Sequence, residues 1–166
     1  ENKIDEDNIV FVNNLTKIGH FNDQMNDELA IAISKDFDID FSEEALKEAN
    51  NIPKYVLEEE KKDRLDLTEE AIFTIDSIST KDMDDAISIK KLPNGNFELG
   101  VHIADVTYYV RPGSALDEEA YNRATSIYLV DRTIPMLPEK LSNMVCSLRA
   151  NEDSLTFSAV FEMNAK

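Results

Sequence analysis

The alternation of apolar and polar residues predicts strands in the second half of the chain. Four runs alternate in this way: residues 73–75, 85–92, 96–106 and 155–163. Period-two alternation is typical of strands that bury one face. Pro93-Asn94-Gly95 separates the second run from the third, and an Asn-Gly pair between alternating runs is a strong hairpin signal. The pattern therefore predicts several strands that are mostly antiparallel.

Helical periodicity and capping residues predict the remaining elements. Ser42 is a typical N-cap, and the two glutamates that follow it favour the positive end of a helix. Ser114 followed by Asp117 has the form of a capping box. The expected helices cover residues 23–34, 42–50, 138–148 and a stretch after Ser114 whose buried side is Leu116, Ala120, Ala124 and Ile127. The predicted fold class is α+β, a mixed, mostly antiparallel sheet with flanking helices.

Composition divides the chain at about residue 68. Residues 52–70 are charged and contain no Gly or Ser, so they are not a flexible linker. Either a short helix or an extended connector fits them. We expect residues 1–67 to form a helical connector segment and residues 68–166 to form the main part of the domain.

Charge and cysteine content limit the possible functions. The 166 residues suffice for one core, and the net charge of −17 argues against gripping nucleic acid by bulk attraction. Cys146 is the only cysteine, so neither an internal disulfide nor a disulfide-linked partner is expected, and a reducing, cytoplasmic location fits. No apolar run reaches the ~20 residues of a membrane span. The chain opens at Glu1 rather than Met, which predicts a piece of a longer protein.

An acidic loop is the strongest chemical signal. Asp76, Asp82, Asp84 and Asp85 fall within ten residues, between two predicted strands. Carboxylates held close together raise one another's pKa values, and a hard divalent cation relieves that repulsion. Mg²⁺, with Mn²⁺ as a substitute, is therefore the expected cofactor, and a pair of such ions is the recurrent device of nucleases.

An acidic loop of this kind can also be a solvated surface or a calcium-binding loop. A solvated acidic surface remains open, because the whole chain is acidic. A calcium loop counted from Asp82 needs Gly at its sixth position and Glu at its twelfth, where this chain has Ile87 and Pro93. The calcium-loop pattern therefore fails.

Five motifs together resemble one known family. TIDSISTKDMDDA is similar to the catalytic signature of the RNB-domain exoribonucleases, the ribonuclease II and ribonuclease R family. The other four follow the family order: GHFND upstream, then VHIADVTYYV, GSALDEEAYNRATSIYL and IPMLPEKLSNMVCSLRAN. The upstream segment is more similar to ribonuclease R than to ribonuclease II. The resemblance extends over residues 15–163 or so, and it implies a partial RNB-type catalytic domain.

The resemblance implies an activity and a set of site residues. The family hydrolyses single-stranded RNA from its 3′ end with Mg²⁺ and releases nucleoside 5′-monophosphates. Asp76 and Asp85 match the aspartates that bind one ion directly, while Asp82 and Asp84 match those that place a second ion or the attacking water. Tyr128 matches an aromatic residue that stacks on a base, although the run SIYLV by itself favours a core tyrosine.

Several expectations remain less specific. Arg149 lies in a family-like motif, where it fits either a phosphate contact or a structural ion pair. The two histidines have no metal-ligand spacing, and we expect both to be structural. The family's catalytic domain is considerably longer than this chain, so we expect weak or no activity from the chain alone. One alternative function is a catalytically inactive RNB-like RNA-binding or assembly module, and a second is a calcium or structural-metal site in a non-enzyme. The oligomeric state stays open.

Overall fold

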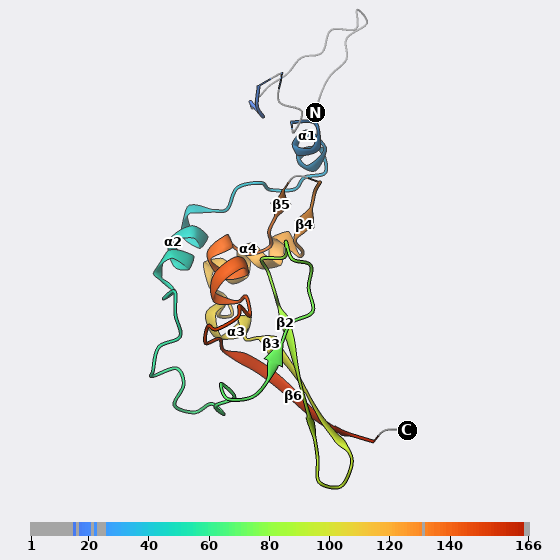
Figure 1. Ribbon diagram of the computed structural model, residues 1–166. Helices are drawn as coiled ribbons and strands as arrows, with labels where there is room; N and C mark the ends of the chain where they lie inside the picture. The colour runs from blue at the N-terminus through green and yellow to red at the C-terminus, as the bar shows by residue number, and fades with distance from the viewer. Residues whose placement is uncertain (1–14, 16, 21, 23–25, 131, 165–166) are drawn as a thin grey trace, which may run out of the picture.

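A four-stranded antiparallel sheet and a cluster of helices make up the chain (Figure 1). The structure is a computed structural model that describes residues 15, 17–20, 22, 26–130 and 132–164. The sheet has the order β1-β2-β3-β6. Its strands are β1 (Ile72–Phe73), β2 (Asp85–Lys91), β3 (Phe97–Ala104) and β6 (Thr156–Met163). A separate two-stranded ribbon consists of β4 (Ile127–Tyr128) and β5 (Thr133–Ile134). The predicted α+β class, with a mostly antiparallel sheet, is confirmed.

A small apolar core beside the sheet is surrounded by α2 (Glu43–Asn51), α3 (Val106–Tyr109), α4 (Ala115–Arg123) and the π-helical turn η1 (Leu141–Val145). The first helix, α1 (Asn26–Ser34), contributes none of its residues to that core. Leu116 and Leu141 are completely buried in this core, together with the small Ala45 of α2. Residues 23–25 of the first predicted helix lie outside the described residues. Among the described residues, no helix is both long and apolar enough to cross a bilayer.

The predicted hairpin connects β2 and β3. Leu92 N donates to Asn96 O at 2.8 Å, and Gly95 takes a φ of 89°, which is accessible to glycine without steric cost. The register pairs Asp85 with Ile103 at one end of the hairpin and Lys91 with Phe97 at the other. The hairpin therefore places the end of the acidic loop at the end of the sheet that meets the helices.

One sheet face buries a polar cluster. His102 is 2% exposed, and its ring nitrogens lie 2.8 Å from Ser158 Oγ and 3.0 Å from Ser88 Oγ. A Cβ at Gly100 would lie only 2.4 Å from Ser88 Oγ, so only glycine fits beside this cluster. The expectation that His102 is structural is thus confirmed.

The opposite sheet face is apolar and open. Strand pairing puts these apolar side chains on one face: Phe73, Ile87, Ile89, Phe97, Leu99, Val101, Ile103, Phe157, Ala159, Phe161 and Met163. Phe157 is 75% exposed and Phe161 is 49% exposed. Figure 1 shows this part of the sheet projecting away from the helices. We call it the open sheet face.

Capping residues set the starts of α2 and α4 and connect the two helices. Ser42 accepts from Ala45 N at 3.3 Å, and Ser114 accepts from Asp117 N at 3.2 Å, as the sequence predicts. Ser42 Oγ also donates to Glu119 Oε2 at 2.7 Å. This bond links the start of α2 to the middle of α4.

Some predicted elements are shorter than expected. α4 ends at Arg123 because Ala124 adopts a left-handed φ of 62°, so Ala124 and Ile127 do not extend its buried side. β1 covers only two residues, and Ile75 beyond it is 80% exposed. The predicted strand 96–106 stops at Ala104, where Asp105 caps α3.

The segment between α2 and β1 is an irregular connector rather than a third helix. It runs around the helical cluster in a series of turns (Figure 1). Lys61 pairs with Asp153 at 2.9 Å, and Arg64 pairs with Asp105 at 2.6 Å. These two ion pairs attach the connector to the rest of the chain. The division of the chain at residues 67 and 68 stays a prediction.

Candidate active site

Two aspartates of the acidic loop open into one cavity. Asp82 and Asp84 line a cavity of about 240 Å³ between the end of β3, the β4 strand and η1. The alternation of an extended loop predicts that these two side chains share a side, and the cavity agrees with it. Its other lining residues are Ile103, Ala104, Val106, Ser126, Tyr128, Met136, Leu137, Ser142 and Cys146. The site thus combines two carboxylates, a phenol and largely apolar walls.

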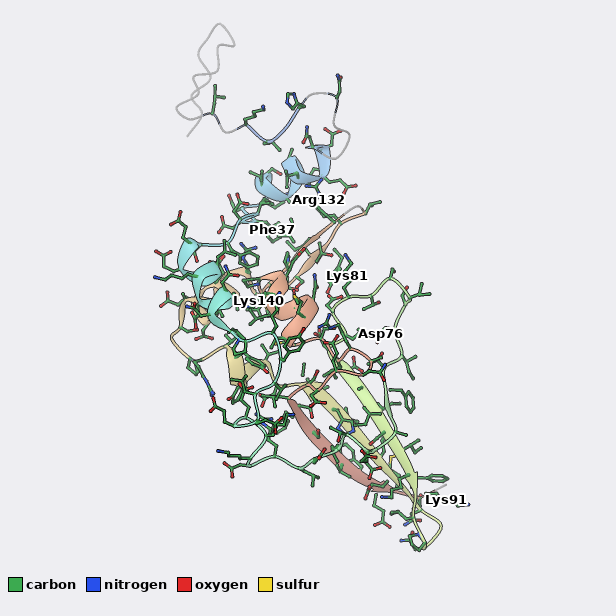
Figure 2. All side chains as sticks on the ribbon, turned by 60° about the vertical axis from the view of Figure 1, so that its left-hand side comes forward. Phe37, Asp76, Lys81, Lys91, Arg132 and Lys140 are labelled. Atoms are coloured by element: carbon green, nitrogen blue, oxygen red, sulfur yellow. The ribbon has the colours of Figure 1, made fainter. Side chains whose placement is uncertain are left out.

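The other two aspartates lie outside this cavity. Asp76, Asp84 and Asp85 are all exposed, but of these three only Asp84 lines the cavity. Figure 2 shows Asp76 and Lys81 on the loop that leads into β2. Within the described ranges, no three or more His, Cys, Asp or Glu side chains are grouped closely enough to hold a metal ion. The structure therefore brings Asp82 and Asp84 together and leaves Asp76 and Asp85 at the margin.

The other three carboxylates are nevertheless close enough to Asp84 to disfavour its negative charge. Burial at the cavity raises the pKa of the Asp84 carboxyl, and the negative charges of Asp82, Asp85 and Asp76 raise it further, in that order. Mg²⁺ is typically held by one or two carboxylates, with water and substrate phosphates completing its coordination. A mutually repelling pair on a shared cavity fits such an ion, because the ion would remove the repulsion.

Tyr128 lies directly beside the acidic pair. Its hydroxyl donates to Asp82 Oδ2, and this bond is the main reason that the pKa of Tyr128 rises to about 12. The side chain is 66% exposed on β4. The interpretation of Tyr128 as a core residue, which the run SIYLV favours, is therefore wrong. Only the family resemblance indicated an exposed position at the site.

Arg149, the second expected substrate-binding residue, forms an ion pair with Glu152. Its guanidinium pairs with the Glu152 carboxylate, and it does not line the cavity. The structural ion pair is thus the contact that exists in this chain. Cys146 does line the cavity but is only 3% exposed, and burial raises the pKa of its thiol to about 12. That thiol stays protonated at neutral pH, as expected for a buried, inert cysteine.

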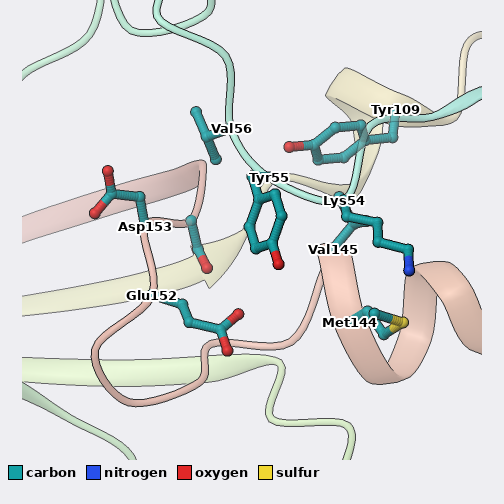
Figure 3. Close-up of a pocket in the computed structure, with 9 residues that line it drawn as sticks. Lys54, Tyr55, Val56, Tyr109, Met144, Val145, Glu152 and Asp153 are labelled. Carbon is teal, nitrogen blue, oxygen red and sulfur yellow. The ribbon is translucent and has the colours of Figure 1, made fainter.

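A second cavity is too small for a substrate. It measures about 10 Å³, which is room for about one water molecule. Figure 3 shows it between the connector and the segment after η1. Its labelled neighbours are Lys54, Tyr55, Val56, Tyr109, Met144, Val145, Glu152 and Asp153. The cavity at Asp82 and Asp84 is therefore the candidate site.

The sequence did not indicate the role of Ser147, a buried residue that contacts the acidic loop. Ser147 is 1% exposed and contacts the loop backbone at Lys81 and Met83. A buried serine in the run MVCSL gives no chemical signal by itself, since its importance depends on what folds against it.

The chain is similar to known proteins over most of its length. The family model described as "RNB domain" matches residues 64–166. The chain is 49% identical over 147 residues to ribonuclease R 1 of Lactococcus lactis, covering 89% of this chain and 18% of that protein. It is 54% identical over 125 residues to ribonuclease R of Thermotoga maritima, covering 75% of this chain and 18% of that one. The chain thus spans about a fifth of the length of these relatives.

Solved structures with the same fold give a consistent result. RNase R of Mycoplasma genitalium in complex with ribose-methylated single-stranded RNA matches with a TM-score of 0.81 and 35% identity. That match covers 89% of this chain and 23% of the other. A complex of the same enzyme with double-stranded RNA gives a TM-score of 0.81 and covers 26% of that chain.

Proposed function

The chain belongs to the RNB-domain family, and from that premise we propose that it is part of an exoribonuclease. The proposed reaction is hydrolysis of single-stranded RNA from its 3′ end with release of nucleoside 5′-monophosphates. One observation carries the proposal: Asp82 and Asp84 share a cavity with the exposed Tyr128 ring, inside the segment that matches the family. The RNA complexes of the Mycoplasma genitalium relative support RNA as the substrate.

The cofactor proposed for this site is Mg²⁺, with Mn²⁺ as a substitute. Asp82 and Asp84 would contribute oxygens from the cavity, and Asp76 and Asp85 would contribute from its margin, as the resemblance implies. When bound, such a cation lowers the pKa of a water molecule and stabilises the departing 3′ oxygen. The positive charge is needed for a second reason, because a chain with a net charge of −17 repels RNA phosphates.

Tyr128 has two proposed roles that its own geometry supports. Its hydroxyl donates to Asp82, so it orients that carboxylate within the cavity. Its exposed ring offers a flat surface on which the terminal base could stack, and stacking contributes ~1–3 kcal/mol per base regardless of sequence. Arg149 is proposed to contact a phosphate, which requires it to exchange its Glu152 partner for the RNA backbone.

Calorimetric titration of this chain with MnCl₂ and MgCl₂ tests the proposed metal site. We expect saturable binding that is lost in Asp76→Ala, because removing one carboxylate leaves fewer oxygen ligands near the cavity. Asp63→Ala is the control, since Asp63 is exposed on the connector and lies outside the acidic loop. Equal weakening by both substitutions would show only non-specific attraction to an acidic chain and would contradict the proposal.

An assay of the chain alone on uniformly labelled single-stranded RNA tests whether this segment is sufficient for catalysis. We expect little or no release of mononucleotides, because the chain spans only 18% of the related enzymes. Robust, processive release would show that the described residues suffice for catalysis.

A further inference from the structure

The buried hydroxyl of Ser147 forms two hydrogen bonds to the backbone of the acidic loop. Ser147 Oγ donates to Lys81 O at 2.8 Å and accepts from Met83 N at 3.2 Å. Both partners are main-chain groups, and the residue between them is Asp82. Ser147 therefore joins the backbone on the two sides of Asp82 and closes the loop around it.

Two further hydrogen bonds extend this attachment. Leu148 N donates to Met83 O at 2.8 Å, and Ala104 N donates to Asp84 O at 2.9 Å. Both main-chain groups of Met83 are thus bound to the Ser147–Leu148 segment. The backbone of Asp84 is bound to the end of β3, so the two cavity-lining aspartates belong to one attached stretch.

Ser147 is itself connected to the buried helical core through η1. Ser147 N donates to Met144 O at 3.2 Å, and Cys146 N donates to Leu141 O at 2.9 Å, so Ser147 directly follows the η1 turn. Leu141 at the start of that turn is completely buried in the helical core. The position of the acidic loop is therefore set by the core rather than by the solvent-exposed loop itself.

We propose that Ser147 is a positioning residue that holds Asp82 and Asp84 in the geometry needed to bind a divalent cation. This inference rests on the proposed function for the role of the cation. Groups that orient metal ligands typically change metal affinity by about 10- to 100-fold when they are removed. Ser147 acts through the backbone of the loop and touches neither substrate nor ion.

The test compares Ser147→Ala with Ser88→Ala in this chain. Ser147→Ala removes both bonds to the loop, whereas Ser88→Ala removes a hydroxyl bonded to His102, away from the acidic loop. We expect Mn²⁺ affinity, measured by calorimetry, to fall about 10- to 100-fold in Ser147→Ala and to stay at the wild-type value in Ser88→Ala. Amide hydrogen exchange of Met83 should be slow in the wild type and fast only in Ser147→Ala. Wild-type affinity together with unchanged Met83 exchange in Ser147→Ala would overturn the proposal.

Two outcomes separate this inference from the proposed function. If the wild type binds no divalent cation, the proposed metal site fails, and Met83 exchange alone decides whether Ser147 holds the loop. If circular dichroism shows that Ser147→Ala is unfolded, Ser147→Cys takes its place, because a thiol of similar size fits the buried position and makes only weak hydrogen bonds. Ser147→Cys is then judged by the same two measurements, and wild-type values in both would overturn the proposal.

Discussion

Asp84→Asn in the full-length protein should lower the turnover of single-stranded RNA by about 100- to 1,000-fold, because the amide would hold less well the cation that stabilises negative charge in the transition state. Asp84 lines the candidate cavity, and its amide replacement keeps nearly the same size while losing the negative charge. RNA binding should change little, because a carboxylate does not attract phosphates. The measurements are kcat on a labelled RNA and Kd for the same RNA.

The thermal stability of Asp84→Asn distinguishes a catalytic effect from a folding defect. Burial and neighbouring aspartates raise the pKa of Asp84, so its ionised form is disfavoured in the folded chain. A carboxyl whose pKa is raised by folding contributes stability at low pH, and this contribution to the free energy of unfolding is lost as the pH rises through the raised pKa. A neutral amide should therefore leave the melting temperature at pH 7 equal or higher in metal-free buffer.

The control for this prediction is Asp63→Asn on the exposed connector, which should leave both kcat and the melting temperature unchanged. Unchanged turnover in Asp84→Asn would contradict the assignment of the site. Absence of turnover in the full-length wild type, with RNA binding retained, would instead support the inactive RNA-binding or assembly module.

Local signals explain which elements could be predicted. The Asn94-Gly95 turn and the caps at Ser42 and Ser114 act within a few residues, and the structure has all three. The predicted end of α4 was wrong because the helical periodicity of the sequence continues through Ala124, whereas the backbone of Ala124 is left-handed. Periodicity reports which side of a helix avoids water, and it gives no information on where tertiary contacts end the helix.

The open sheet face also shows that a periodic pattern gives no information on tertiary contacts. Period-two alternation of Phe157 and Phe161 predicts a strand with one apolar face, and β6 has it. It does not predict what covers that face, and in this chain the two rings are 75% and 49% exposed. Alternation therefore fixes the orientation of side chains, while burial depends on parts of a protein that the alternation cannot identify.

The candidate site was only partly predictable for a related reason. The acidic composition of residues 76–85 and the shared side of Asp82 and Asp84 are visible in the sequence, but the cavity that this side faces is not. The placement of the loop at that cavity depends on contacts with Tyr128 and Ser147, which lie 46 and 64 residues further along the chain from their partners in the loop. Hydrogen bonds over such separations leave no periodic pattern.

Asp105→Ala should lower the free energy of unfolding of this chain by about 3 kcal/mol, because it leaves a half-buried guanidinium without its carboxylate and removes a helix cap. Asp105 Oδ2 pairs with Arg64 at 2.6 Å, and the two side chains are only 13% and 29% exposed. Asp105 Oδ1 accepts from Thr107 Oγ1 at 2.9 Å and from Tyr108 N at 3.2 Å. Urea denaturation followed by circular dichroism measures the change.

The matched control for Asp105→Ala is Asp153→Ala, which breaks the ion pair between Lys61 of the connector and Asp153. Asp153 and its partner Lys61 are 54% and 38% exposed, and exposed pairs contribute little to stability. Asp153→Ala should therefore leave the urea midpoint almost unchanged. Equal destabilisation by the two substitutions would show that the connector is held by general charge attraction rather than by the Arg64–Asp105 contact.

The pH dependence of the Asp105→Ala effect follows from the same contact. Burial alone would raise the pKa of Asp105, but the bonds from Arg64 and Thr107 outweigh it and hold the pKa below its ordinary value. A carboxyl with a lowered folded pKa stabilises the fold fully above its unfolded pKa of about 3.9, and this stabilisation is lost as the pH falls through the folded pKa. The difference in stability between the wild type and Asp105→Ala should thus be constant from pH 5 to 7 and shrink below about pH 4. A difference that stays constant into acid would mean that the charge of Asp105 contributes nothing, and that the cost of the substitution comes from lost packing at the start of α3.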